Sequence, residues 1–121
     1  MTFEQWDVVV VPFPFADRAA TRRRPALVVS RADPLGNVVG HHVLAMITSA
    51  AHRRWPLDVP VGDLESAGLP APSFVRMKLF TLDDRLVERR AGALDPADAV
   101  AVRAALARAL GFDVDQAAEP T

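Results

Sequence analysis

The alternation of hydrophobic and polar positions predicts several short strands followed by one helix. Apolar and β-branched runs occupy residues 7–13, 24–30, 41–49, 57–61, 73–82 and 89–94, and proline, glycine and polar clusters separate them. Residues 33–37 are typical of a turn, and residues 63–68 of a single helical turn that ends at a glycine. Strands at this spacing indicate a mainly β protein, either a small barrel or a compressed sandwich.

One helix is expected over residues 96–110. Asp95 is a favourable N-cap, Pro96 suits the first helical position, and Gly111 supplies the stop. The apolar face expected to pack on the strands comprises Val102, Ala105, Leu106, Ala109 and Leu110. We expect residues 1–112 to form a single domain and the polar residues 113–121 to be a flexible tail.

The composition excludes several kinds of functional site. The chain has 121 residues and no cysteine, which excludes disulfides, zinc–thiolate sites and a cysteine nucleophile. No apolar run is long enough to cross a membrane, and the N-terminus lacks the order of a signal peptide, so a cytoplasmic protein is expected. His41 and His42 are adjacent and point to opposite faces of a strand, while His52 stands alone. We therefore expect neither a metal site nor a cofactor.

The net charge of −1 hides an uneven distribution. Residues 1–54 carry +3, residues 55–92 carry −1, and residues 93–121 carry −3. Thirteen of the fourteen basic residues are arginine, which suits phosphate contacts, although such usage also follows from a GC-rich genome. Because binding depends on the local field, the total charge does not argue against a nucleic-acid partner.

The run at residues 73–82 carries two different faces. Val75, Met77 and Leu79 share one face and read as core. The other face presents an aromatic–basic–basic–aromatic series: Phe74, Arg76, Lys78 and Phe80. Such a series suits single-stranded nucleic acid, because aromatic rings stack on bases and cations hold phosphates. The alternative is an outer face whose aromatics pack under the helix and whose cations are solvated.

Two further features concern arginines and a hydroxyl. Arg22, Arg23 and Arg24 precede Pro25, which favours an extended backbone at Arg24. They form either an anion-binding cluster or a solvated basic loop. Thr48 ends an apolar strand, where its hydroxyl could meet a ligand or satisfy the backbone.

Several short segments together resemble the PemK/MazF toxins of bacterial type II toxin–antitoxin systems. They are DVVVVPFPF from Asp7, RRPALVVS from Arg23, LAMITS from Leu44, AGL at 67–69, PSFVR at 72–76 and TLD at 81–83. The similarity extends over residues 6–111. It implies an SH3-like barrel with a C-terminal helix (the PemK/CcdB-like toxin fold), which acts as a homodimeric, ribosome-independent messenger-RNA endonuclease. It also implies a cognate antitoxin whose acidic segment mimics phosphates in the arginine-lined groove.

The resemblance implies roles at matched positions. Arg24 would stabilise charge at the phosphate or transfer a proton, Thr48 would contact the scissile region, and Arg76 would act on the phosphate or as an acid. The residues expected to contact RNA are Asp17, Arg22, Arg23, Ser73, Phe74, Lys78 and Phe80.

The sequence also departs from the family pattern. Lys78 replaces a common carboxylate, Trp6 replaces a common glycine, and Asp17 is the one acid in the segment that replaces the usual first loop. The general base of a metal-independent cleavage by the substrate's 2′-OH is thus left open among Asp17, a histidine and Lys78. Two other functions fit the same fold: a gyrase poison that cleaves nothing, and a non-catalytic SH3-like binding module.

Overall fold

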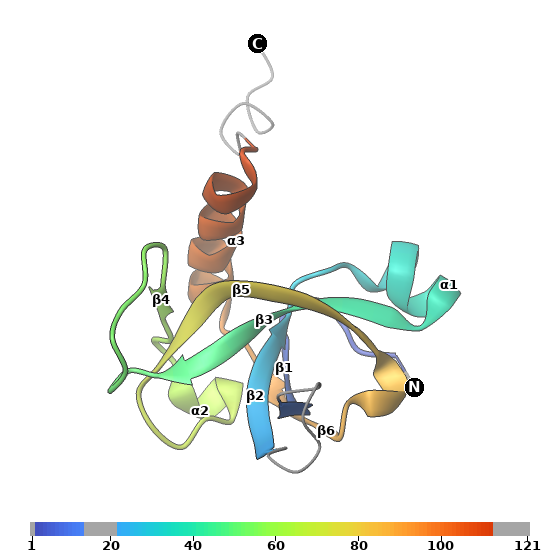
Figure 1. Cartoon of the computed structure of the whole chain (residues 1–121), viewed down its shortest axis with the longest axis horizontal. Helices are drawn as coiled ribbons and strands as arrows, with labels where there is room; N and C mark the ends of the chain where they lie inside the picture. Colours follow the sequence, from blue (N-terminus) through green and yellow to red (C-terminus); the bar gives the residue numbers. More distant parts are fainter. Residues whose placement is uncertain (1, 14–21, 113–121) are drawn as a thin grey trace.

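The computed structural model describes residues 2–13 and 22–112, which form a curled antiparallel sheet and a C-terminal helix (Figure 1). The six strands lie in the order β4-β5-β3-β2-β1-β6. They are β1 (Asp7–Phe13), β2 (Arg22–Val28), β3 (His41–Ser49), β4 (Val59–Pro60), β5 (Ser73–Asp83) and β6 (Arg89–Ala93). Within the described residues no ladder joins β4 to β6, so the predicted small barrel is an open half-barrel.

The helical segments are short apart from the last. They are η2 (Ala32–Gly36), α1 (Asn37–Val39), α2 (Leu64–Ala67), η3 (Asp84–Leu86) and α3 (Pro96–Leu110). The turn predicted at residues 33–37 is therefore the helical pair η2 and α1. Helix α3 has the predicted caps: the Asp95 carboxylate accepts the Ala97 N–H at 3.1 Å, and Gly111 adopts φ 81°. No helix in the described ranges is long and apolar enough to span a bilayer.

Strand β2 is shifted relative to the sequence prediction. It begins at Arg22 because Arg22 pairs with Phe13 of β1. It ends at Val28 because, just beyond it, the Ser30 hydroxyl accepts the Val43 N–H at 2.9 Å in place of a backbone carbonyl. The side-chain bond ends the regular ladder between β2 and β3 and lets the chain turn into η2.

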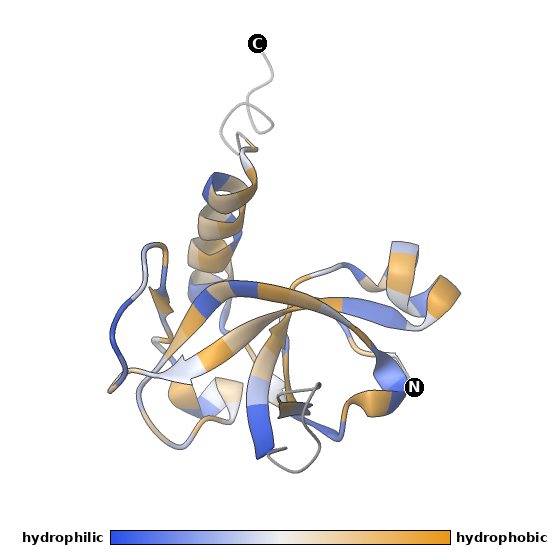
Figure 2. Ribbon diagram, viewed as in Figure 1, coloured by the Kyte–Doolittle hydropathy of each residue, from blue (hydrophilic) through white to orange (hydrophobic). Residues whose placement is uncertain are grey.

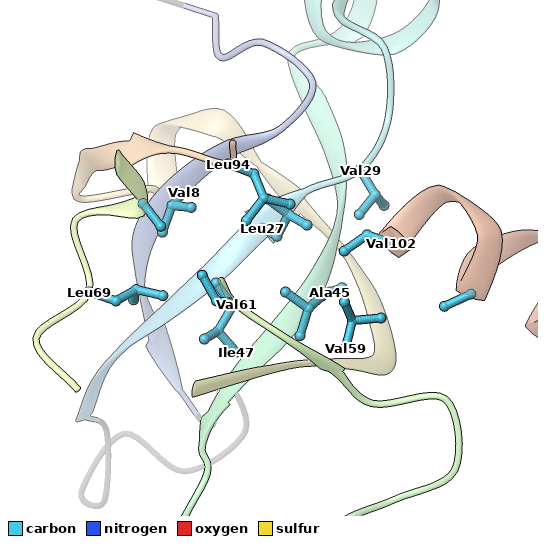
Figure 3. Close-up of a cluster of buried hydrophobic side chains, with 13 residues drawn as sticks. Val8, Leu27, Val29, Ala45, Ile47, Val59, Val61, Leu69, Leu94 and Val102 are labelled. Atoms are coloured by element: carbon cyan, nitrogen blue, oxygen red, sulfur yellow. The ribbon is translucent and has the colours of Figure 1, made fainter. Parts of the chain in front are cut away.

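One face of the sheet packs against α3 and α2. Val8, Leu27, Ala45 and Val59 from four strands join Val102 of α3 in a first hydrophobic cluster (Figure 3). The predicted apolar face of α3 is buried at Val102 and Ala105, but Ala109 and Leu110 are exposed. The last turn of α3 projects beyond the sheet (Figure 1). The apolar side chains at the end of the helix therefore extend past the surface that could bury them.

The opposite face carries a second hydrophobic cluster. Its buried members come mainly from β1, β2, β3 and β5 and are Phe3, Val9, Val11, Ala26, Val28, Leu44 and Leu82. Phe80 packs against this cluster. Phe80 thus lies on the face that the sequence predicted, opposite the face that α3 covers.

His42 is fully buried beside this second cluster. Its ring meets the edge of Phe3 with centroids 5.8 Å apart, and its Nε2 lies 4.0 Å from Asp84 Oδ2. No described group is hydrogen-bonded to either ring nitrogen. Burial lowers the pKa of His42, although the nearby Asp84 carboxylate opposes that shift. His42 is therefore held in the neutral form.

This burial predicts a pH-dependent stability. The unfolded chain takes up a proton at this histidine near pH 6.5, whereas the folded chain resists it. The free energy of unfolding should therefore fall as the pH drops below 6.5, by at most about 1.4 kcal/mol per pH unit. Urea unfolding at pH 7.5, 6.5 and 5.5 should show that His42→Leu removes this slope, whereas the half-buried His41, changed to Gln, should retain it. Equal slopes in wild type and His42→Leu would contradict the assignment.

Trp6 occupies a backbone position that favours glycine. Its φ is 76°, in the left-handed region that a bulky residue rarely adopts. The conformation is held because the Trp6 N–H donates to the Val28 carbonyl at 2.7 Å and its own carbonyl accepts from Leu94 at 2.8 Å. The indole also packs against the first cluster. These contacts offset the strain and explain how the chain keeps tryptophan where the resembled family has glycine.

Candidate nucleic-acid interface

The second face of the sheet changes character along its strands. Beyond its hydrophobic cluster, the same face becomes polar and encloses a pocket of about 90 Å³. The pocket is lined by Phe13, Arg24, Met46, Ile47, Thr48, Trp55, Arg76 and Lys78. The three residues predicted to act in catalysis, Arg24, Thr48 and Arg76, thus meet at one place from three different strands.

An irregularity in β5 shapes this pocket. Ala45 pairs with Leu79 and Ile47 with Val75, so residues 76–78 of β5 face the single residue Met46 of β3. Two extra residues bend the strand but preserve the alternation of faces. Arg76 and Lys78 both line the pocket as a result.

Arg24 is a half-buried cation without a counter-ion in the described part of the chain. It lies opposite Val11 in the ladder between β1 and β2. Its Nε is buried and hydrogen-bonded to no described group, and no described acid lies within ion-pairing distance. A partly desolvated guanidinium is costly when unpaired. The arrangement favours an anion with planar or tetrahedral oxygens in the pocket.

Arg76, by contrast, already has a carboxylate partner. Its Nε and Nη2 donate to the two oxygens of Asp58 at 3.1 and 2.9 Å, and Nη2 also donates to the Arg53 carbonyl at 2.7 Å. Both side chains are buried. Burial alone would raise the pKa of Asp58, but hydrogen bonds from Arg76 and the Trp55 N–H outweigh it and hold that pKa below its usual value. The charge of Arg76 is therefore largely neutralised within the protein.

Thr48 connects the pocket to a histidine. Thr48 pairs with Phe74 on β5 and lines the pocket, and its Oγ1 lies 3.0 Å from His52 Nδ1. His41 and His42 begin β3, at the end near α1, whereas His52 follows the other end of the strand (Figure 1). Among the histidines, His52 is therefore the one placed beside the pocket.

Comparison with known proteins identifies the family. Residues 4–110 match the model of the PemK-like, MazF-like toxin of type II toxin–antitoxin systems. The chain belongs to this toxin family. No curated protein matches the chain in sequence.

Solved structures of the same fold cover nearly the whole toxin. A MazE–MazF structure from Deinococcus radiodurans has a TM-score of 0.75 at 23% identity, covering 93% of this chain and 100% of that one. An endoribonuclease in complex with its cognate antitoxin, from a mycobacterial species, has a TM-score of 0.71 at 19% identity and covers 93% of this chain and 96% of that one. The toxin MazF-mt6 of Mycobacterium tuberculosis gives 0.70 at 22% identity, with coverage of 88% and 98%.

The residues predicted to contact RNA differ in their exposure and in their contacts within the toxin. Arg22 and Lys78 are exposed, and Lys78 Nζ lies 5.1 Å from the centroid of the Phe13 ring. Arg23 is ion-paired with Glu88. Phe74 lies under the Arg54 guanidinium at 5.3 Å. The start of β2 and the middle of the connection between β3 and β4 are both strongly hydrophilic (Figure 2).

Two other predicted residues, Ser73 and Phe80, lie apart from this arrangement. The Ser73 hydroxyl donates to the Ala71 carbonyl at 2.8 Å, which matches the structural role of a strand-end hydroxyl. Phe80 is not among the residues lining the pocket and packs in the adjacent hydrophobic cluster. Asp17 lies outside the described residues. Within the described ranges, no three His, Asp or Glu side chains are grouped so as to hold a metal ion.

Sequence reasoning missed Asp58 and Trp55. Asp58 was included in an apolar run, and its burial at 5% exposure is explained by Arg76, a residue 18 positions away. Trp55 follows Arg53 and Arg54, and a large aromatic beside two cations is the signal that could have indicated it.

Proposed function

We propose that this toxin is an endoribonuclease that cleaves single-stranded RNA. The observation that carries the proposal is the pocket in which Arg24, unpaired among the described residues, the Thr48 hydroxyl and Lys78 converge. Two cations and a hydroxyl at the mouth of a small cavity suit a phosphodiester group. Membership of the toxin family supports the same conclusion.

The proposed reaction uses the substrate's own hydroxyl. A base removes the proton of the 2′-OH, and the 2′ oxygen forms a bond to the adjacent phosphorus. The bond from phosphorus to the 5′ oxygen then breaks, and a proton is delivered to that leaving oxygen. The products are a 2′,3′-cyclic phosphate and a 5′-OH end, so atoms and charge balance without a metal ion in any step.

Each pocket residue has a proposed task. Arg24 stabilises the extra negative charge of the phosphorane, because its guanidinium has no competing carboxylate among the described residues. Lys78 adds a second positive charge, and Thr48 orients the scissile phosphate. Arg76 acts as a positioning residue, since Asp58 and the Arg53 carbonyl already engage its Nε and Nη2.

His52 is the proposed general base. When its Nδ1 carries the proton and donates to Thr48 Oγ1, its Nε2 holds a free lone pair that can accept the 2′-OH proton. The Thr48 hydroxyl then fixes the ring orientation next to the group that binds phosphate. This arrangement favours His52 among the candidate bases, in the role that the family carboxylate, replaced here by Lys78, would otherwise fill.

Replacing His52 tests this role. His52→Ala should lower kcat for RNA cleavage about a hundred- to ten-thousandfold, the usual contribution of a general base, with little change in KM. Lys78→Met should instead mainly raise KM, because it removes a charge that faces the substrate. Steady-state kinetics on one RNA substrate separates the two. A His52→Ala variant with wild-type kcat, combined with a Lys78→Met variant that has lost kcat, would assign the base to Lys78.

The decisive experiment for the function is cleavage of mixed-sequence single-stranded RNA by the purified toxin in EDTA. We expect fragments that carry 2′,3′-cyclic phosphate and 5′-OH ends. Absence of cleavage on all substrates would contradict the proposal. Inhibition of DNA supercoiling by gyrase would then favour a gyrase poison, and RNA binding without products would favour a binding module.

We also propose that a cognate antitoxin blocks this pocket. MazE–MazF complexes are among the structures of similar fold. Acidic side chains of an antitoxin would pair with Arg24 and Lys78 much as phosphates do. As in the resemblance noted above, the active toxin is proposed to be a homodimer.

A further inference from the structure

Trp55 is a large aromatic side chain exposed at the edge of the pocket. It retains 43% of its accessible surface and also lines the pocket beside Arg24 and Thr48. The other exposed large apolar side chains within residues 2–13 and 22–112 are absent from the pocket lining and are Val38, Val39, Leu86, Val100, Leu110 and Phe112. Trp55 is therefore part of the proposed RNA site, whereas the other exposed apolar residues lie outside it.

The turn that carries Trp55 is strained and firmly held. The Asp58 N–H donates to the Trp55 carbonyl at 3.2 Å, which closes a four-residue turn with Pro56 second and Leu57 third. Leu57 has φ 69°, in the region that favours glycine at the third position of such turns. The Trp55 N–H donates to Asp58 Oδ2 at 2.8 Å. Strain of this kind persists where the surroundings fix the conformation, and it is common at binding sites.

Arg76 supports the indole from inside the protein. Its guanidinium carbon lies 4.4 Å from the centroid of the Trp55 ring. Asp58 holds that guanidinium through two hydrogen bonds. The buried Arg76 guanidinium thus packs against one face of the ring, while Trp55 as a whole remains 43% exposed. The indole is thus an oriented, flat platform before any ligand arrives.

The pocket next to this platform is too small for a whole nucleotide. Its volume is about 90 Å³, well below the roughly 300 Å³ at which pockets enclose small molecules. A phosphate can enter it, but an attached base must remain outside. The neighbouring surface is cationic and aromatic, with Arg54 over Phe74 and Lys78 over Phe13. A flat anionic ligand, namely a nucleotide of a single strand, fits both parts.

We propose that Trp55 stacks on the base of a nucleotide adjacent to the cleaved phosphate and thereby determines where the RNA is cut. The inference rests on the proposed endoribonuclease function and extends it to a residue that selects the site. Stacking holds the base at the rim while the neighbouring phosphate enters the pocket beside Arg24 and Thr48. Purines are favoured at this position because they overlap the indole over a larger area.

Binding of an uncleaved strand tests the platform directly. The probe is a 5′-labelled RNA with a 2′-deoxy nucleotide at the mapped cleavage position, which removes the attacking hydroxyl. Stacking contributions predict that Trp55→Ala weakens binding about 5- to 150-fold by fluorescence anisotropy. Trp55→Phe should recover most of the affinity. Leu86→Ala, a matched change at another exposed apolar residue, should leave the affinity unchanged.

Removing bases one at a time identifies the stacked nucleotide. An abasic site at that position should weaken binding by wild type but not by Trp55→Ala. In a second measurement, binding of the intact strand should quench tryptophan emission in wild type but not in Trp55→Phe. Suppose that wild type cleaves RNA, but that an abasic site at any position weakens binding by wild type and by Trp55→Ala to the same extent. The stacking inference is then overturned, while the endoribonuclease function stands. If wild type neither binds nor cleaves RNA, both are overturned. Thermal melting of each variant separates lost stacking from misfolding, and the quenching comparison uses the folded Trp55→Phe.

Discussion

Arg24→Ala is expected to lower kcat for RNA cleavage about a hundred- to thousandfold, the typical cost of removing one group that stabilises transition-state charge. Arg24 is the pocket arginine without a described counter-ion, and its Nε is buried and unbonded among the described residues. Its interaction with a phosphate is therefore strongest when the phosphorane carries its extra charge. Steady-state cleavage of a single RNA substrate in EDTA measures the effect.

Arg22→Ala is the matched control. Arg22 lies two residues earlier on β2 and is exposed, so its loss should change cleavage only slightly and mainly through KM. The stability of Arg24→Ala should equal or exceed that of wild type, because the partly desolvated charge that is removed has no counter-ion in the described part of the chain. An Arg24→Ala variant with wild-type kcat would exclude Arg24 from the chemistry.

The second large effect concerns the buried ion pair of Arg76 and Asp58. Asp58→Ala should lower the free energy of unfolding by about 3–5 kcal/mol, because it leaves the Arg76 guanidinium buried without its partner. The double variant Asp58→Leu/Arg76→Met should recover much of that loss, since apolar residues of similar volume avoid the cost of desolvating charge. Urea unfolding of Asp58→Leu, Arg76→Met and the double variant measures the coupling between the side chains.

Acid titration provides an independent check of the same pair. The folded-state pKa of Asp58 lies below its ordinary value, so the stabilisation is present above about pH 3.9 and is lost as the pH falls below it. Arg85→Ala, which breaks the exposed pair with Asp83, is the control and should change stability little because solvent screens that pair. Additive effects of Asp58→Leu and Arg76→Met in the double variant would show that the two side chains do not act as a buried pair.

The two proposals give Trp55 and Arg24 separate tasks in the toxin. Trp55 would bind a base and Arg24 would stabilise the reacting phosphate, so variants at the two positions should change KM and kcat, respectively. Arg76 links them, because it lines the pocket and supports the Trp55 indole. Damage to the pair of Arg76 and Asp58 should therefore weaken RNA binding as well as stability.

Elements whose causes are local could be predicted from the linear pattern of residues. The apolar runs at 7–13 and 41–49 became β1 and β3, and Asp95, Pro96 and Gly111 set the limits of α3. The alternation of side chains also assigned Val75 to one face of β5 and Arg76 and Lys78 to the opposite face. Such features depend on neighbouring residues, on capping groups and on a period of two, all of which are visible in a linear pattern.

Which side chains share the pocket, and which cations lack a described counter-ion, could be learned only from the folded chain. Arg24 and Arg76 looked alike as cations in the sequence, but Arg76 meets Asp58 across the sheet edge whereas Arg24 meets no described acid. Phe80 matched Phe74 in the pattern, yet it lies in the hydrophobic cluster. Trp55 became a platform through a turn closed by Asp58 and a guanidinium from another strand. The physical reason is that charge pairing, desolvation and ring stacking depend on distances between residues far apart in the chain, and folding alone sets those distances.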